Sequence, residues 1–366
     1  MHCAYFERGT CRSCGWLADP YADQLQRKMA RCQSALTGLG GVWLPIVPSP
    51  ESAFRNKAKM VVCGDASSPC LGILDAHSDG IDLSSCPLYP TAITDAFEPL
   101  KQMIRRLGIP PYDVKKRQGE LKYLLITVSE DDDSLMVRLV LRSDIWIERL
   151  RADLSKMTAD LPHLAVLSVN IQPVHQAILE GEQEVILTDR ETLTVHLNGL
   201  PFHLRPKSFF QTNTRVAEQL YATARSWVAE VAPAHMWDLF CGVGGFALHC
   251  ADVIPGHVTG IEISAEAIAS AQQSALELGL KNVSFYALGA NEFIDQAVSL
   301  PQMPALVVVN PPRRGLGVGL CAFLDESVVQ TVIYSSCNPE SLARDLAMMP
   351  GFELVKAQVF DLFPHT

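Results

Sequence analysis

The sequence lacks both the long apolar runs of a membrane protein and the regular cysteine spacing of a secreted one. No apolar run approaches the roughly 18 residues that a membrane-spanning helix needs, and no signal peptide precedes Cys3. The 11 cysteines are odd in number and unevenly placed, unlike a disulfide framework. Internal repeats and low-complexity segments are missing too. We therefore expect a protein of the reducing cytoplasm, whose 366 residues suit two domains.

Positive charge is also in short supply. The chain has 30 Lys and Arg against 40 Asp and Glu, which gives a formal net charge of −10. Proteins that bind nucleic acid usually present a basic surface to the phosphates. The basic residues that do cluster form four short groups: Arg105-Arg106, Lys115-Lys116-Arg117, Arg205 with Lys207, and Arg313-Arg314. Because groups of this size are commonly solvated faces, charge alone does not favour an RNA partner.

The second half of the chain carries the pattern of a nucleotide-type site. Residues 237–240 predict a short strand, and the glycine-rich stretch 241–246 follows it before a helix. Residues 258–262 predict a second strand that ends in Glu262, placed to accept hydrogen bonds from ribose hydroxyls. Ser264 then caps a further helix. Strand, glycine loop, helix, strand and acid together favour a nucleoside-containing cofactor.

Two cofactors compete for such a site, a dinucleotide and S-adenosylmethionine. A dinucleotide needs G-x-G-x-x-G, whereas this loop reads Gly242-Val243-Gly244-Gly245 followed by Phe246. Downstream, the predicted strand 306–309 ends in Asn310-Pro311-Pro312, as in many methyltransferases that modify bases. Enzymes that methylate an amino nitrogen usually place an aromatic residue next, but Arg313 stands here. The pattern favours methyl transfer to another atom over an NAD-dependent dehydrogenase.

The candidate nucleophile is Cys337. It follows the predicted strand 328–333 and precedes Asn338-Pro339, so it lies where a strand gives way to a loop. Catalytic groups of open α/β sheets lie at such strand ends. The alternative is an inert core thiol, which is the commoner role for a single cysteine. The nearby cofactor pattern favours the nucleophile.

Four further cysteines, near the N-terminus, form a candidate metal site. Four thiolates hold either zinc or a four-iron cluster. One close pair and two single cysteines favour neither metal strongly; these four are Cys3, Cys11, Cys14 and Cys86. We interpret Cys32, Cys63 and Cys70, in the same third of the chain, as ordinary thiols.

These motifs together resemble the RNA uracil-C5 methyltransferases over essentially the whole chain. The resemblance rests on Ser208-Phe209-Phe210-Gln211-Thr212-Asn213, Asp238-Leu239-Phe240-Cys241-Gly242-Val243-Gly244, Asn310-Pro311-Pro312-Arg313-Arg314-Gly315 and Tyr334-Ser335-Ser336-Cys337-Asn338. The start Met1-His2-Cys3-Ala4-Tyr5-Phe6, with Cys11-Arg12-Ser13-Cys14, resembles the members that act on bacterial 23S ribosomal RNA. The resemblance implies S-adenosylmethionine as methyl donor and a [4Fe-4S] cluster on Cys3, Cys11, Cys14 and Cys86.

The resemblance also implies roles for single residues. Cys337 becomes the nucleophile that adds to carbon 6 of uracil, and Gln211, Phe240 and Glu262 contact the cofactor. Asn310 contacts the cofactor or the uracil pocket. For Phe209 and Phe210 we expect core packing rather than base stacking. Where the family commonly has an Asp that accepts from the adenine amino group, this chain has Gly289, and Asn291 is the alternative acceptor.

The base is the main departure from the family. Family members carry a glutamate a few residues beyond Phe-Pro-His-Thr, on the last strand, and no residue of this sequence follows Thr366. As substitutes we considered His365, expected at a frayed terminus, and Glu340, expected to be a helix-start charge. A sheet without its last strand would have unpaired backbone groups at its edge.

The expected fold class is α/β, with a C-terminal Rossmann-like methyltransferase domain, an N-terminal iron–sulfur lobe and a β-rich central region. The expected domains are residues 1–90 for the iron–sulfur lobe, 91–200 for RNA recognition, and 201–366 for the methyltransferase domain without its last strand. Strands are predicted at 121–129, 135–141, 164–171, 184–187 and 193–197, with helices at 19–39, 89–107, 146–161 and 214–231.

The predicted function is S-adenosylmethionine-dependent methylation of carbon 5 of a specific uracil in 23S ribosomal RNA, with no membrane or protein partner. One alternative is a transfer-RNA uracil-C5 methyltransferase, which the catalytic motifs do not exclude. The other is a non-catalytic RNA-binding relative, because the base is absent from its family position.

Overall fold

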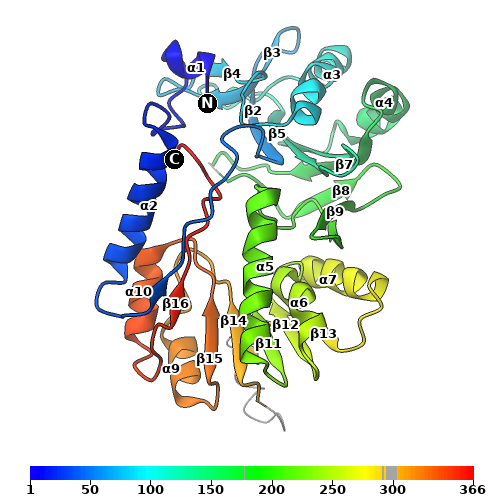
Figure 1. The fold of residues 1–366 in the computed structure, drawn as a ribbon. Helices are drawn as coiled ribbons and strands as arrows, with labels where there is room; N and C mark the ends of the chain where they lie inside the picture. The colour runs from blue at the N-terminus through cyan, green and yellow to red at the C-terminus, as the bar shows by residue number, and fades with distance from the viewer. Residues whose placement is uncertain (177, 291, 294–302) are drawn as a thin grey trace.

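The computed structural model describes residues 1–366 except 177, 291 and 294–302 (Figure 1). Its centre is formed by two sheets of different construction, one mixed and one wholly parallel. No helix among the described residues is both long and apolar enough to cross a membrane. Asn291, the predicted alternative acceptor for adenine, lies outside the described residues.

The mixed sheet has seven strands in the order β4-β3-β2-β5-β6-β7-β8. Its neighbours pair antiparallel except β6 and β7, and a parallel pair needs a crossover, which α4 supplies. Its elements are β2 (Lys57–Gly64), β3 (Pro69–Leu74), β4 (Gly80–Asp82), α3 (Thr91–Leu107), β5 (Leu121–Val128), β6 (Leu135–Leu141), α4 (Ile147–Asp160), β7 (Leu164–Ile171) and β8 (Gln183–Ile186). The sheet takes strands from both sides of the predicted boundary at residue 90.

Helix α3 shows why this part of the chain folds as it does. Ile93, Phe97, Leu100 and Ile104 recur at helical spacing and are at most 1% exposed, so one face of the helix is buried. Gly108 ends the helix in the left-handed region, at φ 70°. The apolar spacing and the glycine stop therefore define both the buried face of α3 and its end.

The parallel sheet has five strands in the order β13-β12-β11-β14-β15. The chain starts in the middle, builds outward through β12 and β13, and then crosses to β14 and β15, so the order reverses between β11 and β14. Its elements are α5 (Thr214–Val231), β11 (Met236–Leu239), α6 (Gly245–Cys250), η1 (Ala251–Val253), β12 (Val258–Glu262), α7 (Ala265–Glu277), β13 (Val283–Ala287), β14 (Leu306–Val309), α9 (Val318–Glu326), β15 (Thr331–Tyr334) and α10 (Pro339–Ala347). This arrangement confirms the predicted Rossmann-like α/β fold.

A hairpin of β9 (Leu193–Leu197) and β10 (Leu200–Leu204) connects the two sheets along the chain. Its two-residue turn is Asn198-Gly199, with φ of 51° and 78°. Asn-Gly between apolar alternating residues is the strongest short hairpin signal, because both residues tolerate positive φ. Strand β9 was predicted, whereas β10 was not: it spans the expected domain boundary at residue 201.

The two termini lie near each other at one end of α2 (Tyr21–Ala35), and the first and last segments of the chain pair with one another (Figure 1). β1 (Val42–Trp43) pairs in parallel with β16 (Lys356–Ala357), while α1 (Ala4–Glu7) and α2 precede β1. Lys28 of α2 pairs with Asp361 at 2.7 Å. The backbone N–H of His365 donates to the side-chain oxygen of Gln24 at 2.8 Å, and His365 is 1% exposed. The expectation of a frayed terminus at His365 was therefore wrong.

Most predicted elements are confirmed. β6, β7, β9 and α5 have the predicted bounds. β5 and α3 differ from prediction by one or two residues at one end, and β8 and α4 by one residue at each end. Helix α2 is shorter than predicted at both ends, because Pro20 precedes its first turn and glycines follow residue 37.

Candidate active site

Three of the predicted site residues lie side by side at the carboxyl edge of the parallel sheet. The register aligns Leu239 of β11 with Ile261 of β12 and with Val309 of β14. The next residue on each strand is therefore at the same level: Phe240, Glu262 and Asn310. The backbone N–H of Asn310 donates to the Leu239 carbonyl at 3.2 Å, which fixes this alignment. The order of strands reverses here, and open α/β sheets bind ligands at such a point.

The glycine loop after β11 is folded back tightly on Glu262. Phe240, Gly242 and Gly244 all have positive φ, of 62°, 55° and 86°. The Glu262 carboxylate accepts from the N–H of Gly242 at 3.3 Å and from that of Ser264 at 3.0 Å. A Cβ at Gly244 would lie 3.0 Å from the Phe285 ring. Glycine is required for this path, which opens backbone space where a ligand can approach.

We expect Glu262→Gln to weaken S-adenosylmethionine binding by about 10–100-fold, because a hydrogen bond to a charged acceptor contributes roughly 1.5–3 kcal/mol. Isothermal titration calorimetry measures the change. The matched control is Glu266→Gln, an exposed carboxylate in the first turn of α7. Equal affinities for both variants and the wild type would contradict a cofactor role for Glu262.

Asp238 is a fully buried carboxyl at the core of β11. Its Oδ2 accepts from the N–H of Ala247 at 2.9 Å, whereas its Oδ1 has no hydrogen-bond partner. Burial raises the pKa of Asp238 to about 8, and the nearby Glu262 charge contributes in the same direction. A carboxyl in this state carries a proton near neutral pH unless a ligand supplies a donor or a positive charge.

In the ligand-free protein, the free energy of unfolding is expected to fall as pH rises from about 4 to about 8. The pKa of Asp238 has its ordinary value of 3.8 in the unfolded chain and is raised to about 8 in the folded protein. Over this window the folded state holds a proton that the unfolded state has released, so rising pH favours unfolding. Urea titrations across the window measure the slope. Asp238→Asn is expected to flatten it, and an unchanged slope would contradict the assignment.

Cys337 lies on an exposed turn between β15 and α10. The Ser336 hydroxyl donates to the Asn338 carbonyl at 2.9 Å, and the Asn338 N–H donates back to that hydroxyl at 3.1 Å. The Asn338 side chain accepts from the Glu340 N–H at 3.2 Å and donates to the Arg313 carbonyl at 3.3 Å. The Cys337 thiol is thus exposed to solvent on a turn whose backbone is held by hydrogen bonds. Asn338 also connects this turn to the loop after β14.

Asp345 is a buried carboxylate that connects the loop after β14 to the end of β15. It comes from α10, is 1% exposed, and its Oδ2 accepts from the N–H of Leu316 at 2.7 Å and from the Tyr334 hydroxyl at 2.6 Å. A Cβ at Gly315 would overlap this carboxylate, so the loop passes it only as glycine. Burial and the bond to Asp345 raise the pKa of Tyr334, which keeps the hydroxyl as donor. Sequence reasoning missed Asp345, since a single acid in a helix has no distinguishing pattern.

Each candidate substitute for the base contacts another group of the chain. Glu340 accepts from the Arg31 guanidinium at 2.8 Å, and this bond lowers the pKa of Glu340. The His365 ring lies within hydrogen-bond distance of Gln24 through Nδ1, at 3.3 Å, and of the Glu51 carbonyl through Nε2, at 2.9 Å. Arg31–Glu340 instead attaches α2 to the helix that follows Cys337. Both residues thus have structural partners.

The loop before α5 carries Gln211 and two phenylalanines. Helix α5 ends just before β11 begins, so its first turn and this loop lie toward the carboxyl edge of the sheet (Figure 1). The Gln211 carbonyl accepts from the Asn56 amide at 3.0 Å, which ties the loop to the mixed sheet. Phe210 is buried, as predicted, but Phe209 is 71% exposed. The core-packing interpretation is therefore wrong for Phe209. Ile263, next to Glu262, is 78% exposed and was also missed.

Most of the predicted basic groups are engaged with acids of the same chain. Ion pairs join Arg105 to Glu98, Arg106 to Asp153 and Asp160, Lys115 to Asp79, Lys116 to Asp113, and Arg205 to Glu191. Arg313 and Arg314 are exposed and have no ion-pair partner in the part of the chain that the structure describes. Both follow Asn310 on the same loop, so their positive charges lie beside the candidate active site.

The four predicted cluster ligands gather in one region of the N-terminal part. Burial raises the pKa of Cys86 to about 11, and the charges of Cys14, Cys3 and Cys11 add to this shift. Burial also raises the pKa of Cys14, followed by the charges of Cys11 and Cys3. The Ser85 N–H donates to the Tyr5 hydroxyl at 3.1 Å, which joins the two segments. Within the described residues, however, no three His, Cys, Asp or Glu side chains stand at metal-ligating geometry.

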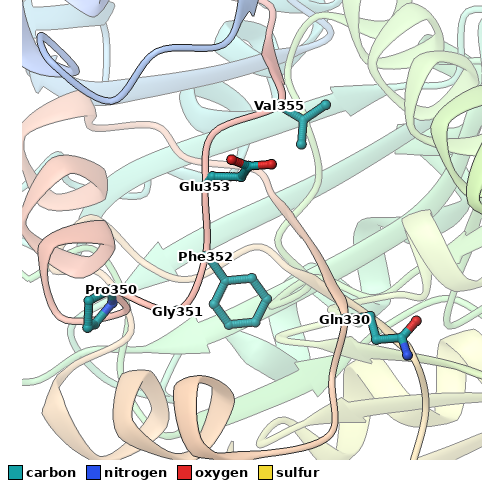
Figure 2. Close-up of a pocket in the computed structure, with 6 residues that line it drawn as sticks. All are labelled: Gln330, Pro350, Gly351, Phe352, Glu353 and Val355. Atoms are coloured by element: carbon teal, nitrogen blue, oxygen red, sulfur yellow. The ribbon is translucent and has the colours of Figure 1, made fainter.

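A cavity of about 480 Å³ lies elsewhere, between the start of β15 and the segment after α10. Figure 2 shows the Phe352 ring pointing into the space between its own segment and Gln330. Gln330 precedes β15, whereas Cys337 follows it, and four residues of strand span roughly 13 Å. The cavity therefore belongs to the opposite edge of the sheet from the candidate active site.

The chain is similar to known proteins over nearly its whole length. The family model described as tRNA (Uracil-5-)-methyltransferase matches residues 20–366. A protein of Halothiobacillus neapolitanus named 23S rRNA (uracil(747)-C(5))-methyltransferase RlmC is 97% identical over 366 residues, covering all of this chain and 97% of that protein. The protein of the same name from Serratia proteamaculans is 51% identical over 367 residues, with 100% and 97% covered.

One solved structure resembles the whole fold. It is the Pyrococcus abyssi tRNA (uracil-54, C5)-methyltransferase in complex with S-adenosyl-L-homocysteine. The TM-score is 0.78 at 24% sequence identity, and the match covers 96% of this chain and 83% of that one. At this identity the likeness concerns the arrangement of both sheets.

Proposed function

The chain belongs to the tRNA (uracil-5-)-methyltransferase family, and we propose that it transfers a methyl group from S-adenosylmethionine to carbon 5 of a uracil in 23S ribosomal RNA. The target is the uracil that corresponds to position 747, the position in the names of the two relatives. The single observation that supports this choice of RNA is 97% identity over the full chain to a protein of that name. A transfer-RNA target, as in the solved structure's title, is the second candidate.

The carboxyl edge of the parallel sheet offers a fitting site for S-adenosylmethionine. Glu262 would accept from the ribose hydroxyls, and the exposed Ile263 would cover one face of the adenine. Asp238 has an unpaired buried oxygen behind the glycine loop, and a ligand ammonium is one group that would satisfy it. Gln211, Phe240 and Asn310 would complete the site. When bound, the cofactor supplies a methyl group on a positively charged sulfur.

Cys337 is the proposed nucleophile. Carbon 5 of uracil attacks a methyl group poorly, but addition of the Cys337 thiolate to carbon 6 converts the ring to an enolate and makes carbon 5 nucleophilic. After methylation, loss of the carbon 5 proton releases the sulfur and restores the ring. The exposed position of Cys337 on a braced turn supports this role. No described residue is assigned to the proton removal, since His365 and Glu340 are held by other partners.

The target uracil must leave its stack to reach Cys337. Phe209, 71% exposed on the loop next to Gln211, offers a flat face on which a displaced base can stack. Arg313 and Arg314 offer positive charge to the neighbouring phosphates. The RNA is then held by a few local contacts, which is how a chain with a net charge of −10 can bind it.

We also propose that Cys3, Cys11, Cys14 and Cys86 hold a [4Fe-4S] cluster. The support is chemical: Cys3 and Cys11 lie close enough to Cys14 and Cys86 to raise the pKa of those two thiols, and such clusters take thiolate ligands. Ligation would tie the first residues of the chain to the loop before α3. The role is structural, since the cluster would hold this lobe in place.

The proposed substrate is tested by giving the protein labelled S-adenosylmethionine with either 23S ribosomal RNA fragments or transfer RNA. Mass spectrometry of nuclease digests locates 5-methyluridine. The expected product is one modified uracil in the 23S fragment and none in transfer RNA. Modification of transfer RNA alone would overturn the ribosomal target while leaving the family activity intact.

The proposed cluster is tested by iron and sulfide analysis of protein purified without oxygen. We expect about four irons per chain, with visible absorption, and loss of both when Cys86 becomes Ser. The matched control is Cys32→Ser, a thiol outside the set. Zinc in place of iron would overturn the cluster. Unchanged folding and RNA binding after replacement of all four cysteines would overturn its structural role.

A further inference from the structure

Two cysteines outside both proposed sites face each other across a β-hairpin. Cys63 lies near the end of β2 and Cys70 near the start of β3, and the antiparallel register pairs them directly. The Cys63 thiol donates to the Cys70 sulfur at 2.7 Å. Directly opposed residues in antiparallel strands have Cα atoms about 4.5–5.5 Å apart, within the range that a disulfide spans. The two sulfurs can therefore be joined without moving the backbone.

The neighbouring strand carries a glycine where a larger residue would collide with the two sulfurs. Gly80 of β4 lies against it, and a Cβ at this position would overlap the Cys63 sulfur and stand 3.2 Å from the Cys70 sulfur. Gly80 is exposed and Cys70 is half-buried, whereas Cys63 is 8% exposed. A small solute therefore reaches Cys70 from solvent, while Cys63 is reached through its partner.

The pair is chemically asymmetric. The hydrogen bond from Cys63 lowers the pKa of Cys70, and the same bond, with burial, raises the pKa of Cys63. Asp82 and Lys101 are the charged groups that act on both sulfurs, in opposite directions, and they pair with each other at 2.5 Å. The more accessible sulfur is thus the better nucleophile, and the buried one keeps its proton.

We propose that Cys63 and Cys70 form a reversible redox modification site, which hydrogen peroxide converts to a disulfide. The Cys70 thiolate attacks one peroxide oxygen, the O–O bond breaks, and hydroxide leaves, so Cys70 becomes a sulfenic acid. The Cys63 sulfur then forms a bond to the Cys70 sulfur and displaces its hydroxyl, which leaves as water with the Cys63 proton. The two thiols lose two electrons and the peroxide gains them. Thiols such as glutathione reverse the reaction.

The position supports reversible modification rather than permanent stabilisation. A bridge between residues 63 and 70 closes a short loop that the hairpin already closes, so it removes little entropy from the unfolded chain. In a reducing compartment such bridges are transient. A reversible bond would nonetheless crosslink β2 to β3, next to β4, and β4 leads into the segment that carries Cys86.

The chain offers a specific assay, because Asp65 lies between the two cysteines. The full-length holoprotein is treated with hydrogen peroxide, free thiols are alkylated, and the protein is cut with trypsin and a protease that cleaves before aspartate. Cys63 then lies on peptide 60–64, Cys70 on peptide 65–74, and Cys86 beyond Asp82 on another. We expect peptides 60–64 and 65–74 to be linked in most molecules, with a loss of about 2 Da relative to their sum, and to separate with dithiothreitol.

Two controls separate this site from general oxidation. Cys70→Ser is expected to abolish the linked species and leave Cys63 open to alkylation, and the buried single thiol Cys250 should stay unmodified under the same peroxide. The proposal is decided by the linkage found in the wild-type protein, so poor folding of the variant would not affect the conclusion. Linkage in fewer than about a tenth of wild-type molecules, or equal linkage of Cys63 to another cysteine, would overturn the proposal.

Discussion

Replacing Cys337 with alanine is expected to abolish methylation of 23S ribosomal RNA, with a loss of at least about 10⁴-fold, as expected when a covalent nucleophile is removed. Without the sulfur, carbon 5 of uracil stays a poor nucleophile, whatever the affinity for RNA. Cys337 is exposed, and its turn is held by neighbouring backbone and hydroxyl groups, so the substitution leaves the fold intact. Initial rates with labelled S-adenosylmethionine measure the effect.

A covalent intermediate gives a second readout of the same prediction. Wild-type protein incubated with RNA that contains 5-fluorouracil is expected to form an adduct that survives denaturation, because fluorine in place of the carbon 5 proton blocks release. Cys337→Ala should form none. Cys321→Ala, a buried cysteine of α9, is the matched control and should form it normally. An adduct in Cys337→Ala would place the nucleophile elsewhere.

Replacing Asp345 with alanine is expected to lower kcat by roughly 100-fold, the cost of an error of about 1 Å in the position of reacting groups. Asp345 is the acceptor that holds both Leu316, on the Asn310 loop, and Tyr334, at the end of β15. Without it, the two segments that meet at the uracil in the proposed mechanism lose their common acceptor. The loss in stability is expected to be smaller, about 1–3 kcal/mol, because removing a buried carboxylate offsets part of the lost hydrogen bonding.

The conservative variant separates positioning from simple destabilisation. Asp345→Asn keeps one oxygen that can accept from both donors, so it should recover most of the activity that alanine loses. A positioning role predicts a fall in kcat with little change in the KM for RNA, and thermal unfolding monitors the fold in parallel. If both variants lose activity only in proportion to their loss of folded protein, Asp345 is structural and the prediction is wrong.

The secondary structure was largely readable from local pattern. The strands of the parallel sheet are short apolar runs, and a central parallel strand such as β14 is apolar on both faces because helices cover both. The helix predicted at residues 214–231 has its observed bounds because Asn213 caps it and the apolar spacing continues to Val231. Strand β10 was missed although Asn198-Gly199 marks a hairpin. The missed signal was turn chemistry, which apolar runs do not reveal.

Contacts between distant segments were not readable in this way. Phe209 and Phe210 are the same residue type in adjacent positions, yet one is 71% exposed and the other buried, which depends on the way the loop meets the rest of the fold. His365 looked frayed because it stands near the end of the chain, but Gln24, 341 residues away, accepts a hydrogen bond from its backbone. No pattern along the sequence records such a pairing.

By itself, the sequence determined the family, the parallel sheet and the residues that reach its carboxyl edge. Strand length, glycines and apolar spacing act over a few residues, and parallel strands bring their ends to one edge whatever the rest of the chain does. Only the tertiary structure decided that Asp345 joins the Leu316 loop to the end of β15, that Glu340 is held by Arg31, and that Cys63 meets Cys70. These depend on packing between segments far apart along the chain, where each partner alone is an ordinary acid, base or thiol.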